Sequence, residues 1–198
     1  LVLHLPLDRV LPRVPVDVDA ERGRLRRLAE VHGDLRGATL VAVRALAVAR
    51  PDLTFILVGS GPMQPSEWGL PNVHDLGTRT QRELADLYRW ADLLLLPSVG
   101  EGYPLVIQEA MACGLPVICG EPCNRADPKA ATWVKGVSID LFDPKTSAQQ
   151  CIAAIDRSLL TAEDRKAMSQ YAMERYDWAS MAKRLLDLTE QGPQVGLH

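Results

Sequence analysis

The sequence predicts an α/β fold in which a mostly parallel β-sheet is covered by helices on both faces. Short apolar segments alternate along the chain with longer segments of helical periodicity, which is typical of such folds. The short segments are nearly continuous runs of Leu, Val and Ile, as expected for strands buried on both sides. With 47% apolar and 24% charged residues, the 198-residue chain can bury a large core, which excludes disordered and collagen-like proteins.

Five short segments have the length and composition of buried strands. They are residues 54–59, 73–76, 92–97, 117–119 and 137–139. Six longer segments have helical periodicity, namely residues 38–49, 81–90, 105–113, 147–159, 162–176 and 179–191. Because strands and helices alternate in this order, we expect the strands to run parallel.

Local signals mark the ends of several predicted helices. Thr80, followed three residues later by Glu83, predicts a capping box at the start of the helix at 81–90. Pro104 suits the first turn of the next helix, where its missing N–H is harmless. Gly114 can adopt the left-handed conformation that ends that helix.

The beginning of the chain has the weakest pattern. Prolines are scattered through residues 1–19, and residues 21–30 form an Arg-rich helical patch. The first residue is Leu1 rather than Met, which favours a partial chain. The expected division is residues 1–37 as a linker or remnant of a preceding domain, 38–191 as one domain and 192–198 as a tail.

Charge and cysteine content exclude several kinds of partner. Twenty-two Lys and Arg against twenty-five Asp and Glu give a net charge of −3, so no nucleic-acid partner is expected. The four cysteines contain no C-x-x-C pair and indicate buried reduced thiols rather than a zinc site or a disulfide framework. No apolar segment is long enough to span a bilayer and no secretory leader is recognised, so we expect a cytoplasmic protein. An amphipathic contact with a membrane surface stays open.

The most informative segment runs from residue 91 to residue 120. A buried strand leads into a loop of small residues, and the loop leads into a helix that begins near Pro104. We expect this loop at the carboxyl end of a parallel strand and at the positive end of a helix, where open α/β sheets bind phosphates and other ligands. Candidate phosphate donors are the backbone N–H groups of Gly102, Tyr103 and Leu105.

Two carboxylates flank the start of this helix. Glu101 precedes it, and Glu109 lies within it, five residues beyond Pro104 or about 7.5 Å along the axis. A carboxylate can accept hydrogen bonds from two neighbouring hydroxyls, so Glu109 suits a ribose and Glu101 a second sugar. The alternative for Glu101 is a solvated turn residue. Glu109 lies amid apolar neighbours, where an unpaired carboxylate would be costly if buried.

At these residues the sequence resembles the donor-binding half of retaining glycosyltransferases of the GT-B fold, family four. The resemblance rests on the E-x7-E spacing of Glu101 and Glu109, on ADLLLLPS at 91–98 and on EAMACGLPV at 109–117. It extends to PDLTFILVGSGP at 51–62, to residues 72–92 and to YDWASMAKRLLDL at 176–188, so that residues 36–191 match in order and spacing.

The resemblance implies a Rossmann-like domain that binds a nucleoside-diphosphate sugar, with an N-terminal domain of the full protein holding the acceptor. It implies glycosyl transfer with retention and no metal, because helix N-termini and basic side chains would take the charge of the leaving diphosphate. By position, Glu109 matches the carboxylate that holds the ribose, and Glu101 the one that contacts the donor sugar. The backbone donors to the distal phosphate are matched by Gly102, Tyr103 and Leu105. A glycine turn at the cleft is matched by Gly59 and Gly61, and the loop that passes the nucleobase is matched by Gly77 and Thr78.

The sequence departs from the family pattern in two ways. Family members have a strand ending in Gly-Arg and, further on, a Lys-Gly whose lysine grips the diphosphate. Here neither that strand nor its Gly-Arg is recognisable, and Arg36 with Gly37 is the candidate replacement for Lys-Gly, although Arg36 could equally be a surface charge. The acceptor domain is also absent from the chain. A noncatalytic nucleotide-sugar-binding or scaffolding module is therefore the alternative to an enzyme.

Other nucleotide-binding and hydrolytic functions lack their motifs. Gly59 and Gly61 are followed by Gln64 where a dinucleotide fingerprint needs a third glycine. Neither G-x4-G-K-[ST] nor G-x-S-x-G occurs, so a P-loop NTPase and an α/β-hydrolase have no support. The motifs leave the nucleobase, the sugar and the acceptor open.

Overall fold

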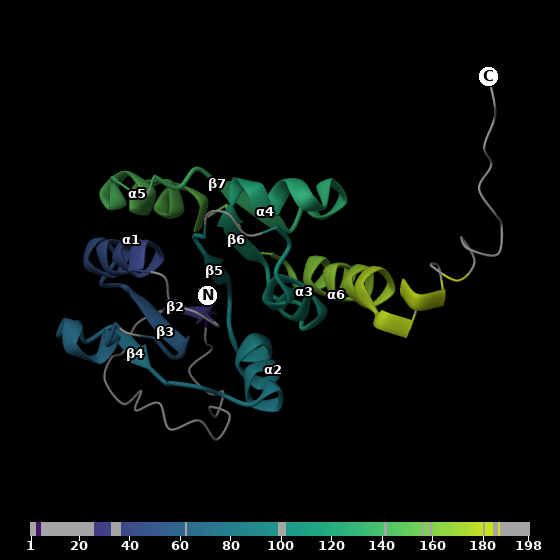
Figure 1. The fold of residues 1–198 in the computed structure, drawn as a ribbon, viewed down its shortest axis with the longest axis horizontal. Coiled ribbons are helices and arrows are strands. Elements are labelled where there is room, and N and C mark those ends of the chain that lie inside the picture. Colours follow the sequence, from purple (N-terminus) through teal and green to yellow (C-terminus); the bar gives the residue numbers. More distant parts are fainter. Residues whose placement is uncertain are drawn as a thin grey trace.

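A largely parallel β-sheet forms the centre of the fold in the computed structural model (Figure 1). The strands stand in the order β4-β3-β2-β5-β6-β7, and β1 pairs antiparallel with the beginning of β2. Their bounds are Leu3–His4 (β1), Arg26–His32 (β2), Leu53–Gly59 (β3), Val73–Asp75 (β4), Leu94–Leu96 (β5), Val117–Gly120 (β6) and Val134–Val137 (β7). The structure describes residues 3–4, 26–32, 37–61, 63–98, 102–140, 142–155, 157–158, 160–179, 181–183 and 186, with only the backbone before residue 40.

β2 lies in the middle of the sheet and corrects the prediction for the beginning of the chain. It pairs along its whole length with β3, from Arg26 opposite Leu53 to His32 opposite Gly59, and it also pairs with β5. The helix predicted at 21–30 is therefore wrong over residues 26–30, and the rest of that segment lies outside the described residues. A domain boundary after residue 37 would separate β2 from its sheet, so we propose that the domain begins at or before Arg26.

The strand order places a topological switch point between β2 and β5. From β2 the chain adds β3 and β4 on one side, then returns to add β5, β6 and β7 on the other. Ligands of open α/β sheets bind outside the carboxyl ends of the strands at such a point. The two strands that border it end at His32 and Leu96.

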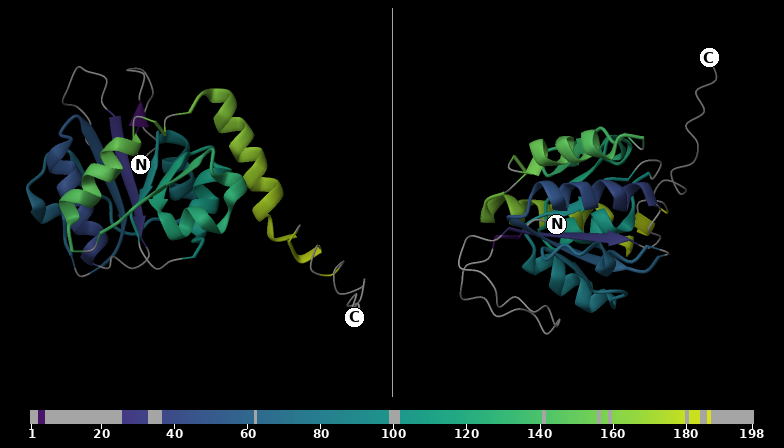
Figure 2. Two further views of the ribbon diagram at one scale, coloured as in Figure 1. Left: turned by 90° about the horizontal axis from the view of Figure 1, so that it is seen from above. Right: turned by 90° about the vertical axis from the view of Figure 1, so that its left-hand side faces the viewer.

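Helices cover both faces of the sheet (Figures 1 and 2). Their bounds are Gly37–Ala49 (α1), Gln81–Trp90 (α2), Leu105–Ala112 (α3), Glu121–Ala126 (α4), Pro144–Ile155 (α5) and Ala162–Tyr176 (α6), with short 3-10 turns at Pro65–Trp68 (η1) and Pro128–Ala130 (η2). On β3, Phe55 and Leu57 join the core under α1 and α5, whereas Ile56 and Val58 join the core under α2, α3 and α6. The predicted α/β class is confirmed, and it explains why the strands are apolar on both sides.

Several predicted helix boundaries are confirmed. The helices expected at 81–90 and 162–176 have those bounds. Thr80 and Glu83 form the predicted capping box, with each side chain bonded to the other's backbone N–H. Gly114 has a φ of 77°, and Pro104 is the N-cap of α3 rather than a residue of its first turn.

The predictions for β7 and α5 are displaced. β7 covers Val134–Val137 instead of 137–139, because Lys135 and Gly136 interrupt the apolar run that served as the strand signal. α5 begins at Pro144 rather than residue 147, because the Asp143 carboxylate accepts hydrogen bonds from the N–H groups of Lys145 and Thr146 and so caps the helix there. Of the helix predicted at 179–191, helical backbone is described at residues 179, 181–183 and 186, and the rest lies outside the described residues.

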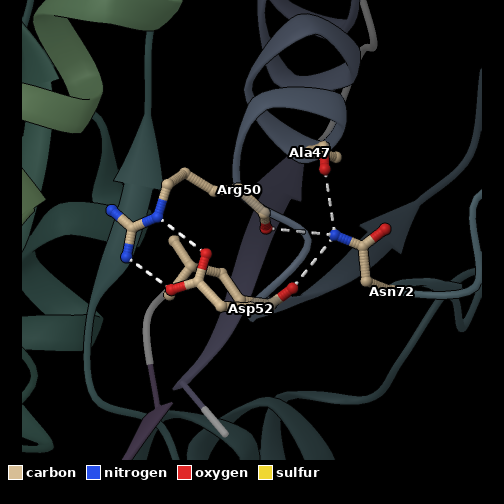
Figure 3. Close-up of polar contacts among 5 residues, drawn as sticks. Ala47, Arg50, Asp52 and Asn72 are labelled. Atoms are coloured by element: carbon tan, nitrogen blue, oxygen red, sulfur yellow. Dashed lines mark hydrogen bonds and ion pairs between the residues drawn. The ribbon is translucent and has the colours of Figure 1, made fainter.

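One polar cluster joins α1, β3 and β4 at the edge of the sheet where the parallel strands begin (Figure 3). The side-chain amide of Asn72 donates to the carbonyls of Ala47, Arg50 and Leu53, at 3.0, 3.3 and 3.1 Å. The Ala47 carbonyl cannot receive the usual helical bond, because residue 51, four positions on, is a proline. Asn72 therefore supplies the partner that the end of α1 lacks.

Candidate functional site

The predicted glycines lie at the carboxyl ends of β3 and β4. Gly59 ends β3 with a φ of 141°, and its N–H donates to the carbonyl of Gly77 at 3.1 Å. Gly77 has a φ of 63°, a conformation that favours glycine, and its N–H donates to the Asp75 carboxylate at 3.0 Å. Thr78 is exposed beside it, and Gly61 is half-buried. These residues thus border the edge of the sheet at which the ligand is expected.

The start of α3 is open to a ligand on its backbone side. Pro104 is the N-cap, and within the described residues no side chain caps the first turn. The Leu105 side chain is 54% exposed, and Gly102 is exposed as well. The amides of a helix start have no intrahelical acceptor and carry the positive end of the helix dipole, so an anion is favoured there.

Glu109 lies one turn further along α3, beside a hollow of about 420 Å³. Burial raises the pKa of its carboxyl above the ordinary value, and no ion pair is recorded for it among the described residues. The hollow opens between α2, α3 and the end of α6. It is lined by Gln81, Leu105, Gln108, Glu109, Ala112, Ala172, Met173, Tyr176, Asp177 and Trp178.

The structure therefore brings some of the predicted residues together and leaves others apart. Leu105, the first residue of α3, and Glu109 line the same hollow, whereas Gly102 and Tyr103 do not. The glycines at the ends of β3 and β4 do not line this hollow. Arg36 and Glu101, predicted as catalytic, lie outside the described residues; in the chain they follow β2 and β5, the strands that border the switch point.

The side chain of Tyr103 turns into the protein. Its hydroxyl lies 2.9 Å from the hydroxyl of Tyr176 and 3.2 Å from the sulfur of Met111. Burial raises the pKa of Tyr103 to about 12, so the phenol stays neutral. Any role of Tyr103 toward a phosphate is therefore left to its backbone N–H, as the sequence predicted.

Sequence reasoning missed several residues of the hollow. Gln81 was noticed only as part of a helix start, although it lines the hollow opposite Glu109. Tyr176 and Trp178 lie at the end of α6, more than sixty positions after Glu109, and no spacing rule connects them. The signal that could have found them is the YDW sequence itself, which belongs to the segment resembling the glycosyltransferases.

Two other expectations concern metals and cysteines. The four cysteines are free, with Cys113 half-buried and the other three buried. In the part of the chain that the structure describes, no group of three or more His, Cys, Asp or Glu could hold a metal ion. None of the described helices is long and apolar enough to cross a membrane.

Comparison with known proteins gives a consistent family. The family model described as glycosyl transferases group 1 matches residues 33–158. The D-inositol 3-phosphate glycosyltransferase of Corynebacterium urealyticum is 31% identical over 191 residues, covering 87% of this chain and 42% of the relative. A GDP-mannose-dependent monoacylated alpha-(1-6)-phosphatidylinositol monomannoside mannosyltransferase of Corynebacterium glutamicum is 25% identical, covering 96% of this chain and 56% of the relative. The chain thus spans about half the length of the curated relatives it matches.

Solved structures show the same fold. Anabaena HepE in complex with UDP matches with a TM-score of 0.64 at 21% identity, covering 83% of this chain and 48% of HepE. Sucrose-phosphate synthase from Thermosynechococcus elongatus matches with a TM-score of 0.66 at 21% identity, covering 83% of this chain and 45% of that one. The predicted GT-B likeness is confirmed for part of those chains.

Proposed function

Because the chain belongs to the glycosyl transferases group 1 family, we propose that it is the part of a retaining glycosyltransferase that binds a nucleoside-diphosphate sugar. The observation that carries this proposal is the hollow that Glu109 shares with Leu105, the first residue of α3. The Glu109 carboxylate can accept hydrogen bonds from hydroxyls, and the N–H groups at the start of α3, about one helical turn away, can donate to an anion. A nucleoside diphosphate carries both groups, a ribose diol and a phosphate, at comparable separation.

The proposed placement follows from the chemistry of each group. Ribose hydroxyls donate to the Glu109 carboxylate, whose pKa burial raises above its ordinary value. The diphosphate lies toward the amides of Gly102, Tyr103 and Leu105, about 6 Å nearer the start of the helix. The nucleobase passes the loop at Gly77.

In the proposed reaction, the bond between the anomeric carbon and the diphosphate oxygen breaks while the acceptor oxygen bonds the same face of the sugar. The acceptor hydroxyl passes its proton to an oxygen of the leaving diphosphate, and the helix amides stabilise the negative charge that remains on that group. We propose that Arg36 also stabilises the charge of the leaving diphosphate and that Glu101 accepts hydrogen bonds from hydroxyls of the donor sugar. The acceptor is held by a second domain of the full-length protein.

Calorimetric titration of the chain with UDP, GDP and ADP, and then with their sugars, tests the donor-binding proposal. We expect one of the three diphosphates to bind, and Glu109→Gln to weaken that binding about tenfold, because it removes charge-assisted hydrogen bonds to the ribose. Glu163→Gln, at the exposed first turn of α6, is the matched control and is expected to bind like the wild type. Absence of binding by all three nucleotides would refute the proposal.

A noncatalytic binding module is the second candidate, and one observation favours it. β2 is present, but the sequence that follows its last residue, His32, is Gly33-Asp34 and contains no Gly-Arg. The full-length protein distinguishes the two candidates. An enzyme hydrolyses or transfers its bound nucleotide sugar, whereas a module binds it with Glu109-dependent affinity and releases it unchanged.

A further inference from the structure

We propose that Tyr176 and Asp127 are positioning residues for the phosphate end of the site, acting through the Tyr103 hydroxyl on the start of α3. This inference rests on the function proposed above. The two residues lie on different elements, at the end of α6 and between α4 and η2, and meet only in the folded chain.

A continuous chain of hydrogen bonds connects these residues to α3. The Tyr176 hydroxyl donates to the Asp127 carboxylate at 2.5 Å, and the Tyr103 hydroxyl lies 2.9 Å from the Tyr176 oxygen. The Tyr176 hydroxyl uses its single proton in the bond to the carboxylate, so Tyr103 is the donor in the bond between the two tyrosines. The sulfur of Met111, 3.2 Å away, competes for the same Tyr103 proton. The rings of Tyr103 and Tyr176 also pack, with centroids 5.5 Å apart.

Asp127 gives this chain a fixed direction. The carboxylate is 6% exposed and accepts further hydrogen bonds from the Tyr171 hydroxyl at 2.8 Å and from the Lys129 N–H at 3.2 Å. Burial alone would raise the pKa of Asp127, but the donated hydrogen bonds and the nearby Arg175 guanidinium hold it below its ordinary value. The acceptor end is therefore ionised at neutral pH, and the Tyr176 hydroxyl donates directly to it.

The start of α3 depends on these contacts because, in the part of the chain that the structure describes, no side chain caps it. Tyr103 immediately precedes Pro104, and its carbonyl accepts a hydrogen bond from the Gln108 side chain at 3.3 Å. The Tyr103 side chain is thus held from α6 and its backbone from α3. Tyr176 also lines the hollow beside Glu109, so one residue touches both proposed ends of the nucleotide site.

Tyr171 provides a matched control. It donates to the same Asp127 carboxylate and packs edge-on against Tyr176, with centroids 6.0 Å apart, but its hydroxyl makes no recorded bond to Tyr103. Tyr→Phe at positions 103, 171 and 176 removes one hydroxyl each and keeps the ring. A purely structural network would respond to the loss at Tyr171 much as to the loss at Tyr176.

The test compares the affinities of a diphosphate and a monophosphate of the same nucleoside, UDP with UMP and GDP with GMP. We expect Tyr103→Phe and Tyr176→Phe to weaken diphosphate binding about fivefold and to leave monophosphate binding within about twofold, as for one lost hydrogen bond. Tyr171→Phe should leave the ratio at the wild-type value. Amide hydrogen exchange at residues 103–107 should accelerate in Tyr176→Phe and not in Tyr171→Phe, and this readout requires no ligand.

Two results overturn the inference in different ways. If the wild type binds a diphosphate and the ratio is unchanged in Tyr103→Phe and Tyr176→Phe, or changed equally in Tyr171→Phe, the positioning role is wrong and the donor site stands. If the wild type binds none of the four nucleotides, the proposed function fails and the inference fails with it.

Discussion

The two ends of the parallel strands satisfy their polar groups in opposite ways. Where the strands begin, the Asn72 amide bonds three carbonyls, including the one that residue 51, a proline, leaves without a helical donor (Figure 3). Where they end, no side chain among the described residues caps the start of α3, and burial raises the pKa of the half-buried Glu109 carboxyl. At the first edge, the polar groups find their hydrogen-bond partners within the protein. At the second edge, polar groups are left whose hydrogen bonds a ligand would supply.

This difference suggests that the edge where the strands begin serves stability, whereas the edge where they end is suited to binding. Buried polar groups in proteins are usually hydrogen-bonded, and a site that departs from this rule gives up stability for function. Substitutions at the two edges should therefore have opposite consequences.

The largest effect is expected at Asn72. Asn72→Ala removes three hydrogen bonds and leaves the Ala47 carbonyl unbonded, so the free energy of unfolding should fall by about 2 to 3 kcal/mol. Urea denaturation measures this loss. Nucleotide affinity of the folded variant should equal that of the wild type; a weaker affinity would break the separation between the edges.

At Glu109 the comparison predicts a loss of binding together with a gain in stability. A carboxyl whose pKa is raised in the folded state contributes stability below its unfolded pKa and loses that contribution as the pH rises through the folded pKa. Glu109→Gln should therefore unfold at higher urea than the wild type at pH 7, and the difference should vanish near pH 3. A variant that is less stable at pH 7 would mean that the carboxylate is already satisfied within the protein.

Asp127 should behave in the reverse sense. Its pKa lies below the ordinary value, so its stabilising contribution is present above the unfolded pKa, near 3.8, and is lost as the pH falls through the lower folded pKa. Unfolding free energies measured from pH 7 to pH 2 should decline less steeply in Asp127→Asn than in the wild type. Parallel declines would show that the tyrosine hydroxyls do not stabilise the ionised carboxylate.

The smallest effect is expected for the ion pair beside Asn72. Arg50 contacts the Asp52 carboxylate through two nitrogens, at 2.8 and 2.7 Å, but the Asp52 side chain is 56% exposed. Exposed pairs contribute about 0.2 to 1 kcal/mol and are screened by salt. Asp52→Asn should thus cost less than Asn72→Ala, and the difference from the wild type should shrink in 1 M salt. A larger loss of unfolding free energy for Asp52→Asn than for Asn72→Ala would mean that the ion pair, and not the Asn72 amide, stabilises this edge.

The sequence was sufficient for elements whose pattern is local. The Thr80–Glu83 capping box and the continuous Leu run of β5 are written in adjacent residues, and both were predicted correctly. β2 was missed because Arg26, Arg27 and Glu30 give it the appearance of an exposed helix, although pairing with β3 and β5 places it at the sheet centre. Propensity is a weak signal where tertiary pairing decides.

The residues of the candidate site also differ in whether a local sequence pattern reveals them. Glu109 could be singled out because a carboxylate amid apolar neighbours at the start of a helix is unusual in the sequence itself. Asp127 and Tyr176 could not, because their interaction joins positions 49 residues apart and exists only after α6 packs beside α3. The residues proposed to bind the nucleotide are visible in a motif, whereas the residues proposed to position them are recognised only in the fold.

The most direct test of the central claim is an amide-resolved NMR titration of the chain with UDP and GDP. The account predicts saturable shift changes for one nucleotide at Gln81, Leu105, Gln108 and Glu109, with none at Ala47, Arg50 and Asn72 at the opposite edge. Shift changes confined to the edge where the strands begin, or no changes with either nucleotide, would contradict it.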